Sequence, residues 1–239
     1  MIKKPVVLTV VGITVLALVG VAALAAAGTK NGYVISDDGR TVTATKMPQV
    51  VTPGMRDASL TTIAGNLSDY PYGIFFCCFG NTIAQEGSGG FPFTTWVAIP
   101  FTPSANVTVT KIEASVGTFG GTSEFELSLR EDASGLPGNA IKSFHITTPP
   151  TYGACCTLDV GKDKAGIPLT ANTQYWIAAT TTSKDVFEGG WAFNSTDMRS
   201  YPIASYCKGP STYCGTTNNG KWVAGMSYDP LPAYAILGH

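Results

Sequence analysis

Short runs of apolar residues, many of them alternating with polar ones, recur along the chain from Leu60 to the C-terminus. Glycine, proline, asparagine and serine separate these runs, and no segment shows a long helical period. Alternation with a period of two is typical of strands, and regularly spaced short strands are typical of all-β domains. The pattern predicts strands at residues 73–79, 96–101, 107–116, 124–130, 140–147, 156–160, 174–181, 191–194, 222–226 and 233–237. Their number and spacing predict a two-sheet antiparallel β-sandwich with jelly-roll-like connections.

The clearest alternation lies between residues 124 and 130, where Phe125, Leu127 and Leu129 alternate with charged or polar residues. Side chains point to opposite faces of a strand in turn, so these three residues share one face. We therefore expect one face of this strand in the core and the other in solvent.

The segment 107–116 has an interrupted alternation, because the apolar phase changes between Val109 and Ile112. An extra residue in one strand of a pair shifts the phase in this way. We expect a bulge or a bend near Lys111.

Residues 1–27 have the features of an export signal and are expected to be helical. Lys3 and Lys4 provide positive charge before an uncharged run, rich in valine, leucine and alanine, that ends in small residues. We expect cleavage after Ala27. The alternative is an uncleaved membrane anchor, because the run is long enough to cross a bilayer.

The expected organisation is a signal at 1–27, a leader or linker at 28–59 with room for one short strand, and a sandwich domain at 60–239. Charged residues make up 13% of the chain and the formal net charge is −1. This balance argues against nucleic acid as a partner, because electrostatic binding to phosphates needs a clustered basic surface. We expect a secreted or cell-surface protein that contacts a membrane only through an uncleaved N-terminal segment.

The chain has six cysteines, which in an exported protein favour disulfides over metal binding. They form two doublets and one spaced pair: Cys77 with Cys78, Cys155 with Cys156, and Cys207 with Cys214. The spaced pair suits a local bridge that closes a surface loop. Neighbouring residues in a strand face opposite sides, so the doublets can bridge to each other if their strands are antiparallel neighbours. The alternatives are a strained vicinal bridge in each doublet, free buried thiols, or a zinc site, which usually has separated cysteine pairs.

Several of these motifs together resemble the bacterial exported domains called choice-of-anchor, nearest to the R type. The resemblance covers about residues 60–239 and rests on order and spacing, with the following residues: Cys77-Cys78, Pro-Phe-Thr-Pro at 100–103, Leu-Ser-Leu at 127–129, Gly-Leu-Pro-Gly at 135–138, Cys155-Cys156, Thr-Gln-Tyr-Trp at 173–176, Trp191 and Asn194. It implies a secreted or surface β-sandwich of unestablished activity, attached in some members by a C-terminal anchor. This chain shows no such C-terminal anchor, which puts covalent surface attachment in doubt.

Aromatic residues are crowded into the second half of the chain among asparagine, threonine and serine. Sugars stack on aromatic rings and pair with amides, so an alternative interpretation is a carbohydrate-binding module with Trp191, Tyr213, Trp222 and Asn194 as its ligand-binding residues. The competing interpretation places most of these rings in the core, because sandwich cores use tryptophan and tyrosine heavily. The partners expected are extracellular glycans or other surface or matrix macromolecules.

Catalytic and metal-binding patterns are weak. The two histidines are His145, expected on a strand surface, and His239 at the C-terminus, so the parts of a serine or cysteine triad are missing. Acidic loop residues such as Asp132 would suit a structural calcium ion or, in pairs, glycoside hydrolysis, although they are more simply solvated charges. The sequence therefore predicts a binding or structural module without catalysis, metal or cofactor.

Overall fold

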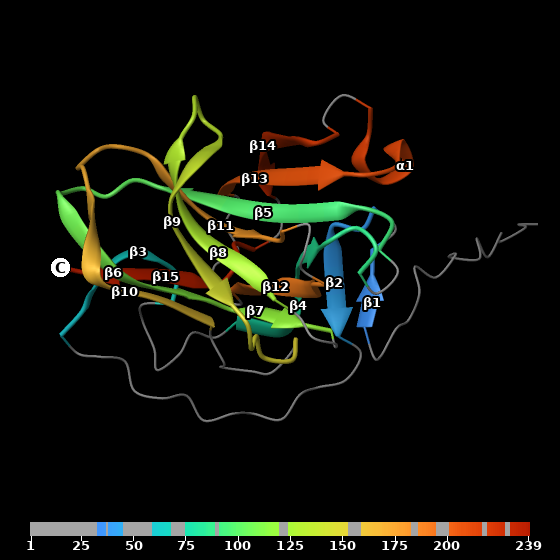
Figure 1. Cartoon of the computed structure of the whole chain (residues 1–239), viewed down its shortest axis with the longest axis horizontal. Helices are drawn as coiled ribbons and strands as arrows, with labels where there is room; N and C mark the ends of the chain where they lie inside the picture. The colour runs from blue at the N-terminus through green and yellow to red at the C-terminus, as the bar shows by residue number, and fades with distance from the viewer. Residues whose placement is uncertain are drawn as a thin grey trace, which may run out of the picture.

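The computed structural model describes residues 33–36, 38–44, 59–67, 75–88, 91–119, 124–152, 159–182, 186–194, 201–216, 219–227 and 230–239 (Figure 1); at residues 33, 75–78, 159 and 227 it describes the backbone alone. These residues form β1 (Tyr33–Ile35), β2 (Thr41–Ala44), β3 (Thr61–Gly65), β4 (Phe75–Ala84), β5 (Thr94–Phe101), β6 (Val107–Ala114), β7 (Val116–Thr118), β8 (Phe125–Asp132), β9 (Pro137–Ile146), β10 (Asp159–Leu169), β11 (Tyr175–Thr180), β12 (Glu188–Asn194), β13 (Tyr201–Lys208), α1 (Ser211–Cys214), β14 (Lys221–Ser227) and β15 (Tyr234–Gly238). The expectations for the export signal and for the side chains of both cysteine doublets lie outside the described residues.

Eight of the strands form a jelly roll made of two facing sheets. The small sheet has the order β10-β6-β15-β3, and the order β9-β8-β11-β5 forms the facing part of the large sheet. Along the chain, β3 lies in the small sheet, β5 in the large one, β6 in the small one, β8 and β9 in the large one, β10 in the small one, β11 in the large one and β15 in the small one. This alternation is the jelly-roll connection, and all named strand pairs in it are antiparallel. The predicted fold class, an antiparallel β-sandwich, is confirmed.

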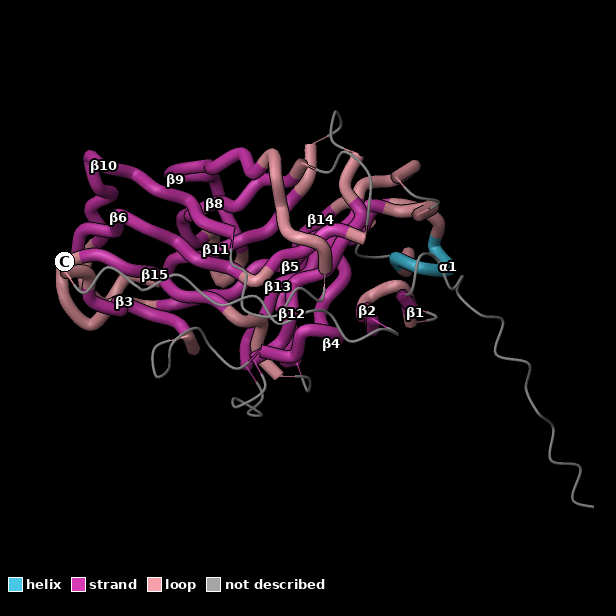
Figure 2. The backbone as a smooth tube through the Cα atoms, turned by 90° about the horizontal axis from the view of Figure 1, so that it is seen from below, coloured by secondary structure: helices cyan, strands magenta, loops and turns pink. Residues whose placement is uncertain are grey.

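The main core lies between the two sheets, whose strands are labelled in Figure 2. Phe125, Leu127 and Leu129 of β8 are fully buried in it, as their alternation predicts, and Ile112 of β6 and Ile236 of β15 are fully buried in the same cluster. The other face of β8 is less exposed than expected. Ser128 there is also fully buried, so the solvent face of this strand is covered in its middle.

The irregularity expected near Lys111 is present in β6. The register shifts between Val109 and Lys111 against both neighbouring strands. In β15 the partners of these two residues, Gly238 and Leu237, are adjacent, whereas in β10 their partners, Ile167 and Lys162, are several residues apart. Val109 and Ile112 therefore both face the core although three positions separate them.

The large sheet extends beyond the jelly roll along both edges of the N-terminal half of β5. β4 pairs with β5, β12 and β2, and β13 pairs with the opposite edge of β5 and with β14 (Figure 1). The segment expected to be a linker thus contributes β1 and β2, where one short strand was expected, and β2 pairs with β4 inside the sheet. The strands β3 and β13 were not predicted, and β10 begins and ends later than expected.

A second core cluster includes Tyr152, which lies against glycines of three strands. A Cβ placed on Gly117 of β7 would lie 2.5 Å from the Tyr152 Cα, and one on Gly190 of β12 would lie 2.7 Å from the ring. A Cβ on Gly80 of β4 would lie 2.7 Å from the tyrosine oxygen. The three glycines therefore form a slot that a larger residue would block.

Candidate functional site

Two of the four residues expected to bind a ligand lie in the interior. Trp191 is 0% exposed, and its indole N–H donates a hydrogen bond of 2.9 Å to the Ala233 carbonyl. Asn194 is 1% exposed, and its amide Nδ2 donates to the Asn66 carbonyl. Burial of both side chains is tolerated because their N–H groups donate to backbone carbonyls. Their burial and backbone hydrogen bonds give these two residues structural roles and do not support the ligand-binding roles expected for them.

Tyr213 lies in the short helix α1 and is half-buried. Its ring packs against Phe93, with 4.9 Å between the ring centroids and an interplanar angle of 30°. The helix is joined to the end of β13 by the disulfide between Cys207 and Cys214. The predicted local bridge is thus present. Tyr213 mainly packs α1 against Phe93.

Trp222 is the remaining predicted residue, and it belongs to an aromatic patch that we define as Trp96, Tyr206 and Trp222. The three residues lie side by side on β5, β13 and β14, since Trp96 pairs with Tyr206 and Tyr206 pairs with Trp222 in the strand register. Trp96 and Tyr206 stack with 4.0 Å between centroids and 17° between planes. Trp222 lies 5.8 Å from Tyr206 and 6.1 Å from Trp96. All three rings are partly exposed on the outer face of the large sheet.

Hydrogen bonds fix Trp96 within the patch, whereas Trp222 and Tyr206 have polar groups that are available to a ligand. The Trp96 indole N–H donates to Thr181 Oγ1 at 2.7 Å, and the Thr181 hydroxyl donates to Gln85 Oε1 at 2.8 Å. Within the described part of the chain, the Trp222 indole N–H and the Tyr206 hydroxyl have no such partner, and neither is a buried unsatisfied group. Partial burial among the rings raises the pKa of the Tyr206 hydroxyl above its ordinary value, so it stays a neutral donor at physiological pH.

Beside the patch, the outer face of the large sheet has a floor of small residues. Ala98, Ala178 and Ala204 lie next to one another on β5, β11 and β13 and are fully buried. Trp222 and Trp176 pack against this floor, and Trp176 is 2% exposed. Small residues here let the large rings lie close to the sheet, which limits how far the patch stands out from it.

Asp132 at the end of β8 fixes Trp176 from outside. Its Oδ1 accepts hydrogen bonds from the Trp176 indole N–H at 2.8 Å and from Gln174 Nε2 at 2.7 Å, and its Oδ2 accepts from the Gly135 amide at 2.9 Å. These bonds, the one from Gly135 first, hold the pKa of this carboxyl below its ordinary value. Asp132 is exposed, and these hydrogen bonds give it a structural role at the end of β8.

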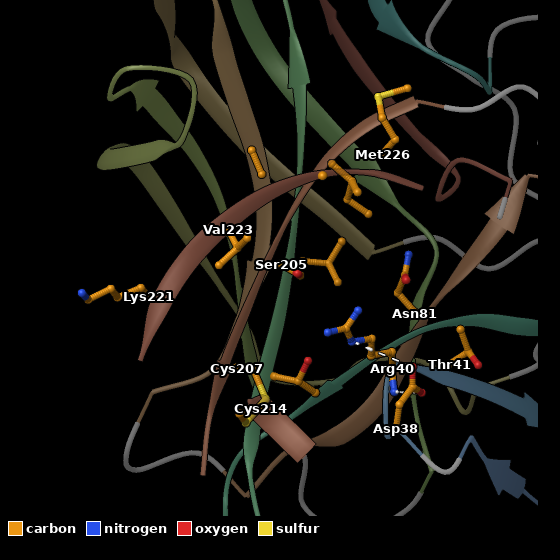
Figure 3. A pocket seen from close by; sticks show the side chains of 15 residues that line it. Asp38, Arg40, Thr41, Asn81, Ser205, Cys207, Cys214, Lys221, Val223 and Met226 are labelled. Atoms are coloured by element: carbon orange, nitrogen blue, oxygen red, sulfur yellow. Dashed lines mark hydrogen bonds and ion pairs between the residues drawn. A yellow bond between two sulfur atoms is a disulfide. The ribbon is translucent and has the colours of Figure 1, made fainter. Parts of the chain in front are cut away.

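A pocket lies on the opposite face of the same strands, between β13–β14 on one side and β2 and β4 on the other (Figure 3). Its volume is about 520 Å³, within the usual range for small-molecule sites. Its lining mixes charged, polar and apolar side chains with the disulfide, and it includes Asp38, Arg40, Asn81, Ser205, Lys221 and Val223. The aromatic patch and this pocket therefore lie on opposite faces of the part of the sheet formed by β5, β13 and β14.

Other chemistry is sparse in the part of the chain that the structure describes. No group of three or more histidine, cysteine, aspartate or glutamate side chains there is close enough to hold a metal ion. In the same residues no helix is long and apolar enough to span a bilayer. His145 lies on the surface of β9, as expected, and its Nε2 is 2.8 Å from Glu124 Oε2.

Sequence reasoning missed Trp96 and Tyr206 as partners of Trp222. Each lies in a run of mixed polarity, and no local signal in the sequence says which strands become neighbours. The alternation that follows Trp96 could have indicated its position. Val97 and Ile99 point into the core, so Trp96 points to the other face of the strand.

No family model, curated protein or solved structure matches this chain. The resemblance to choice-of-anchor domains therefore stays a prediction.

Proposed function

We propose that this protein is a secreted or cell-surface β-sandwich that acts as a non-catalytic binding module, and that its aromatic patch binds carbohydrate. The observation that carries the proposal is the grouping of Trp96, Tyr206 and Trp222 on one outer sheet face, partly exposed and in mutual contact. Aromatic rings combine apolar faces with polar edges and order few rotatable bonds on binding. Such groups suit the C–H faces of sugar rings.

The hydrogen-bonding groups at the patch support the same ligand class. The Trp222 indole N–H, which has no acceptor within the described residues, can donate to a sugar hydroxyl, and the Tyr206 hydroxyl can both donate and accept. Because Trp96 is fixed through Thr181, less side-chain entropy is lost when a ligand binds. The patch thus offers preformed apolar and polar contacts on the same surface.

The proposed location rests on the N-terminal sequence and on the disulfide. A positive start followed by an apolar run is typical of export signals, and a structural disulfide between Cys207 and Cys214 suits an oxidising compartment. N-terminal sequencing of the exported protein tests this point, with Gly28 as the expected first residue.

A glycan array probed with the exported protein tests the carbohydrate proposal, followed by titration calorimetry with the best glycan. We expect Trp222→Ala and Tyr206→Ala each to weaken binding at least about tenfold, as central aromatic residues do in binding sites. The matched control is Ile141→Ala, which removes an exposed apolar side chain from β9, and it should bind like the wild type.

Thermal unfolding of each variant separates lost contacts from lost folding. Loss of folding in Trp222→Ala would assign this residue to the core and remove it from the site. If no glycan binds, the carbohydrate proposal is wrong and a passive surface component is the better description. Turnover of any polysaccharide in a panel would instead establish a glycoside-active enzyme.

A further inference from the structure

The pocket behind β13 and β14 contains a buried polar group that lacks a partner. Asn81 of β4 is 9% exposed and lines the pocket, and its Nδ2 is buried without a hydrogen-bond acceptor among the residues that the structure describes. A buried amide N–H without an acceptor is costly, and native structures rarely keep one without a reason. The terminal torsion of asparagine is soft, so a small rotation can turn Nδ2 toward a ligand in the pocket.

Arg40 is positioned beside this asparagine by backbone pairing. The neighbouring residue Thr41 is the register partner of Asn81, and the Thr82 amide donates to the Arg40 carbonyl at 2.8 Å. The close-up shows the Arg40 side chain between Ser205 and Asn81, while Lys221 extends away at the rim (Figure 3).

The guanidinium of Arg40 is only loosely paired within the protein. Its Nε is 3.9 Å from Asp38 Oδ2, and the side chain is 70% exposed. The other oxygen of Asp38 is already engaged, since Oδ1 accepts from the Ser36 hydroxyl at 2.5 Å and from the Arg40 amide at 3.0 Å. The fork of the guanidinium is therefore available for a bidentate acceptor such as a carboxylate.

We propose that this pocket binds the carboxylate of an acidic sugar, a hexuronate, through Arg40 and Asn81. Arg40 and Lys221 with Asp38 leave the lining with one net positive charge, which matches a monoanion better than a phosphate dianion. Hydroxyl side chains of Thr41 and Ser205 beside apolar Val223 suit a ligand with both hydroxyls and C–H faces. The proposal does not depend on the aromatic patch, which lies on the other face.

Titration calorimetry of the disulfide-bonded full chain with glucuronate, glucose and inorganic phosphate tests the proposal. We expect glucuronate to bind the wild type, and glucose and phosphate to bind at least about tenfold more weakly, because each lacks either the charge or the shape. Arg40→Ala should weaken glucuronate binding at least about tenfold. Arg40→Lys should restore little of it, because lysine keeps the charge but loses the fork.

Two further variants test the role of Asn81 and the specificity of the charge effect. Asn81→Asp should abolish binding, because it replaces a donor with a negative charge near the carboxylate. Lys221→Ala is the matched control: it removes one positive charge, as Arg40→Ala does, but from the rim, and should weaken binding less than about threefold at physiological salt.

Three outcomes would overturn the proposal: no glucuronate binding to the wild type, phosphate binding as tight as glucuronate binding, or equal losses in Lys221→Ala and Arg40→Ala. Trp222→Ala should leave glucuronate binding unchanged, and a loss there would place the acidic sugar on the aromatic patch instead. Thermal melts check folding, and Arg40→Ala is expected to melt like the wild type because its side chain is mostly exposed.

Discussion

The four tryptophans differ in how their indole N–H groups are satisfied, and this difference separates structural from candidate binding residues. Trp176 donates to Asp132, Trp191 to the Ala233 carbonyl and Trp96 to Thr181. Within the described residues, Trp222 has no such acceptor. A buried donor needs a partner within the protein, whereas an exposed donor bonds to water and remains available to a ligand. Among the tryptophans, the hydrogen-bond pattern therefore favours Trp222 as the one whose indole N–H is available to a sugar.

The bonds to Asp132 predict an acid-sensitive contribution to stability. The folded pKa of this carboxyl is lowered, first by the Gly135 amide and then by Trp176 and Gln174, from an ordinary value of 3.8. Its stabilising effect is therefore complete above pH 3.8 and is lost as the pH falls through the lower folded pKa. Asp132→Asn keeps an acceptor but cannot titrate. We expect the difference in unfolding free energy between wild type and Asp132→Asn to favour the wild type at neutral pH and to shrink in acid.

Urea unfolding at several pH values measures this difference. Glu131→Gln is the control, since it removes the adjacent exposed carboxylate in the same hairpin. A constant difference between wild type and Asp132→Asn at all pH values would contradict the prediction. A matching pH dependence in Glu131→Gln would assign the effect to general charge instead.

At the scale of strands, the sequence predicts strand positions and core faces well where apolar and polar residues alternate clearly. It predicts them poorly where other residues obscure the alternation. The alternation in β8 predicted its core face, and the phase change in β6 predicted the irregularity near Lys111. β13 was missed because Pro202 and small or polar residues obscure its period, and proline is tolerated there near a strand end. Trp191 and Asn194 lie in the interior because their polar groups donate to backbone carbonyls there, and composition alone does not reveal such partners. Register across β5, β13 and β14, which creates both candidate sites, depends on contacts distant in sequence.

The glycine slot makes a prediction about three neighbouring strands. A Cβ on Gly190 would lie 2.6 Å from Val42 and 2.7 Å from the Tyr152 ring. Gly190→Ala should therefore overpack the second core and lower the unfolding free energy by about 1–3 kcal/mol. Gly225→Ala in β14 is the matched control, because nothing lies within 4 Å of its Cβ position. It should change stability by less than about 0.5 kcal/mol.

Chemical denaturation of both variants measures the effect, with circular dichroism to check the fold. If Gly190→Ala is as stable as Gly225→Ala, the slot has room that the contacts do not show, and the role assigned to the glycine is wrong.

At the scale of the whole molecule, the jelly roll provides a rigid base and the additional strands carry the candidate sites. β13 and β14 extend the large sheet beyond β5 (Figure 1), so one of their faces bears the aromatic patch and the other bears the pocket (Figure 3). The disulfide between Cys207 and Cys214 attaches this extension to α1. A module built in this way could hold a neutral sugar on one face and an acidic one on the other without a change in fold.

The last prediction concerns the two cysteine doublets, whose side chains lie outside the described residues. Tyr152 precedes Cys155 by three residues, and its hydroxyl lies 2.7 Å from the Cβ position of Gly80, which follows Cys78 by two. We therefore expect two bridges between the doublets, the first of which would add about 4.5 kcal/mol by closing a long loop. Peptide mapping of the unreduced exported protein by mass spectrometry should give one species that contains both doublets and separates on reduction. Separate doublet peptides, each two hydrogens lighter than the dithiol, would show vicinal bridges, and alkylation without reduction would show free thiols; either result would contradict the prediction.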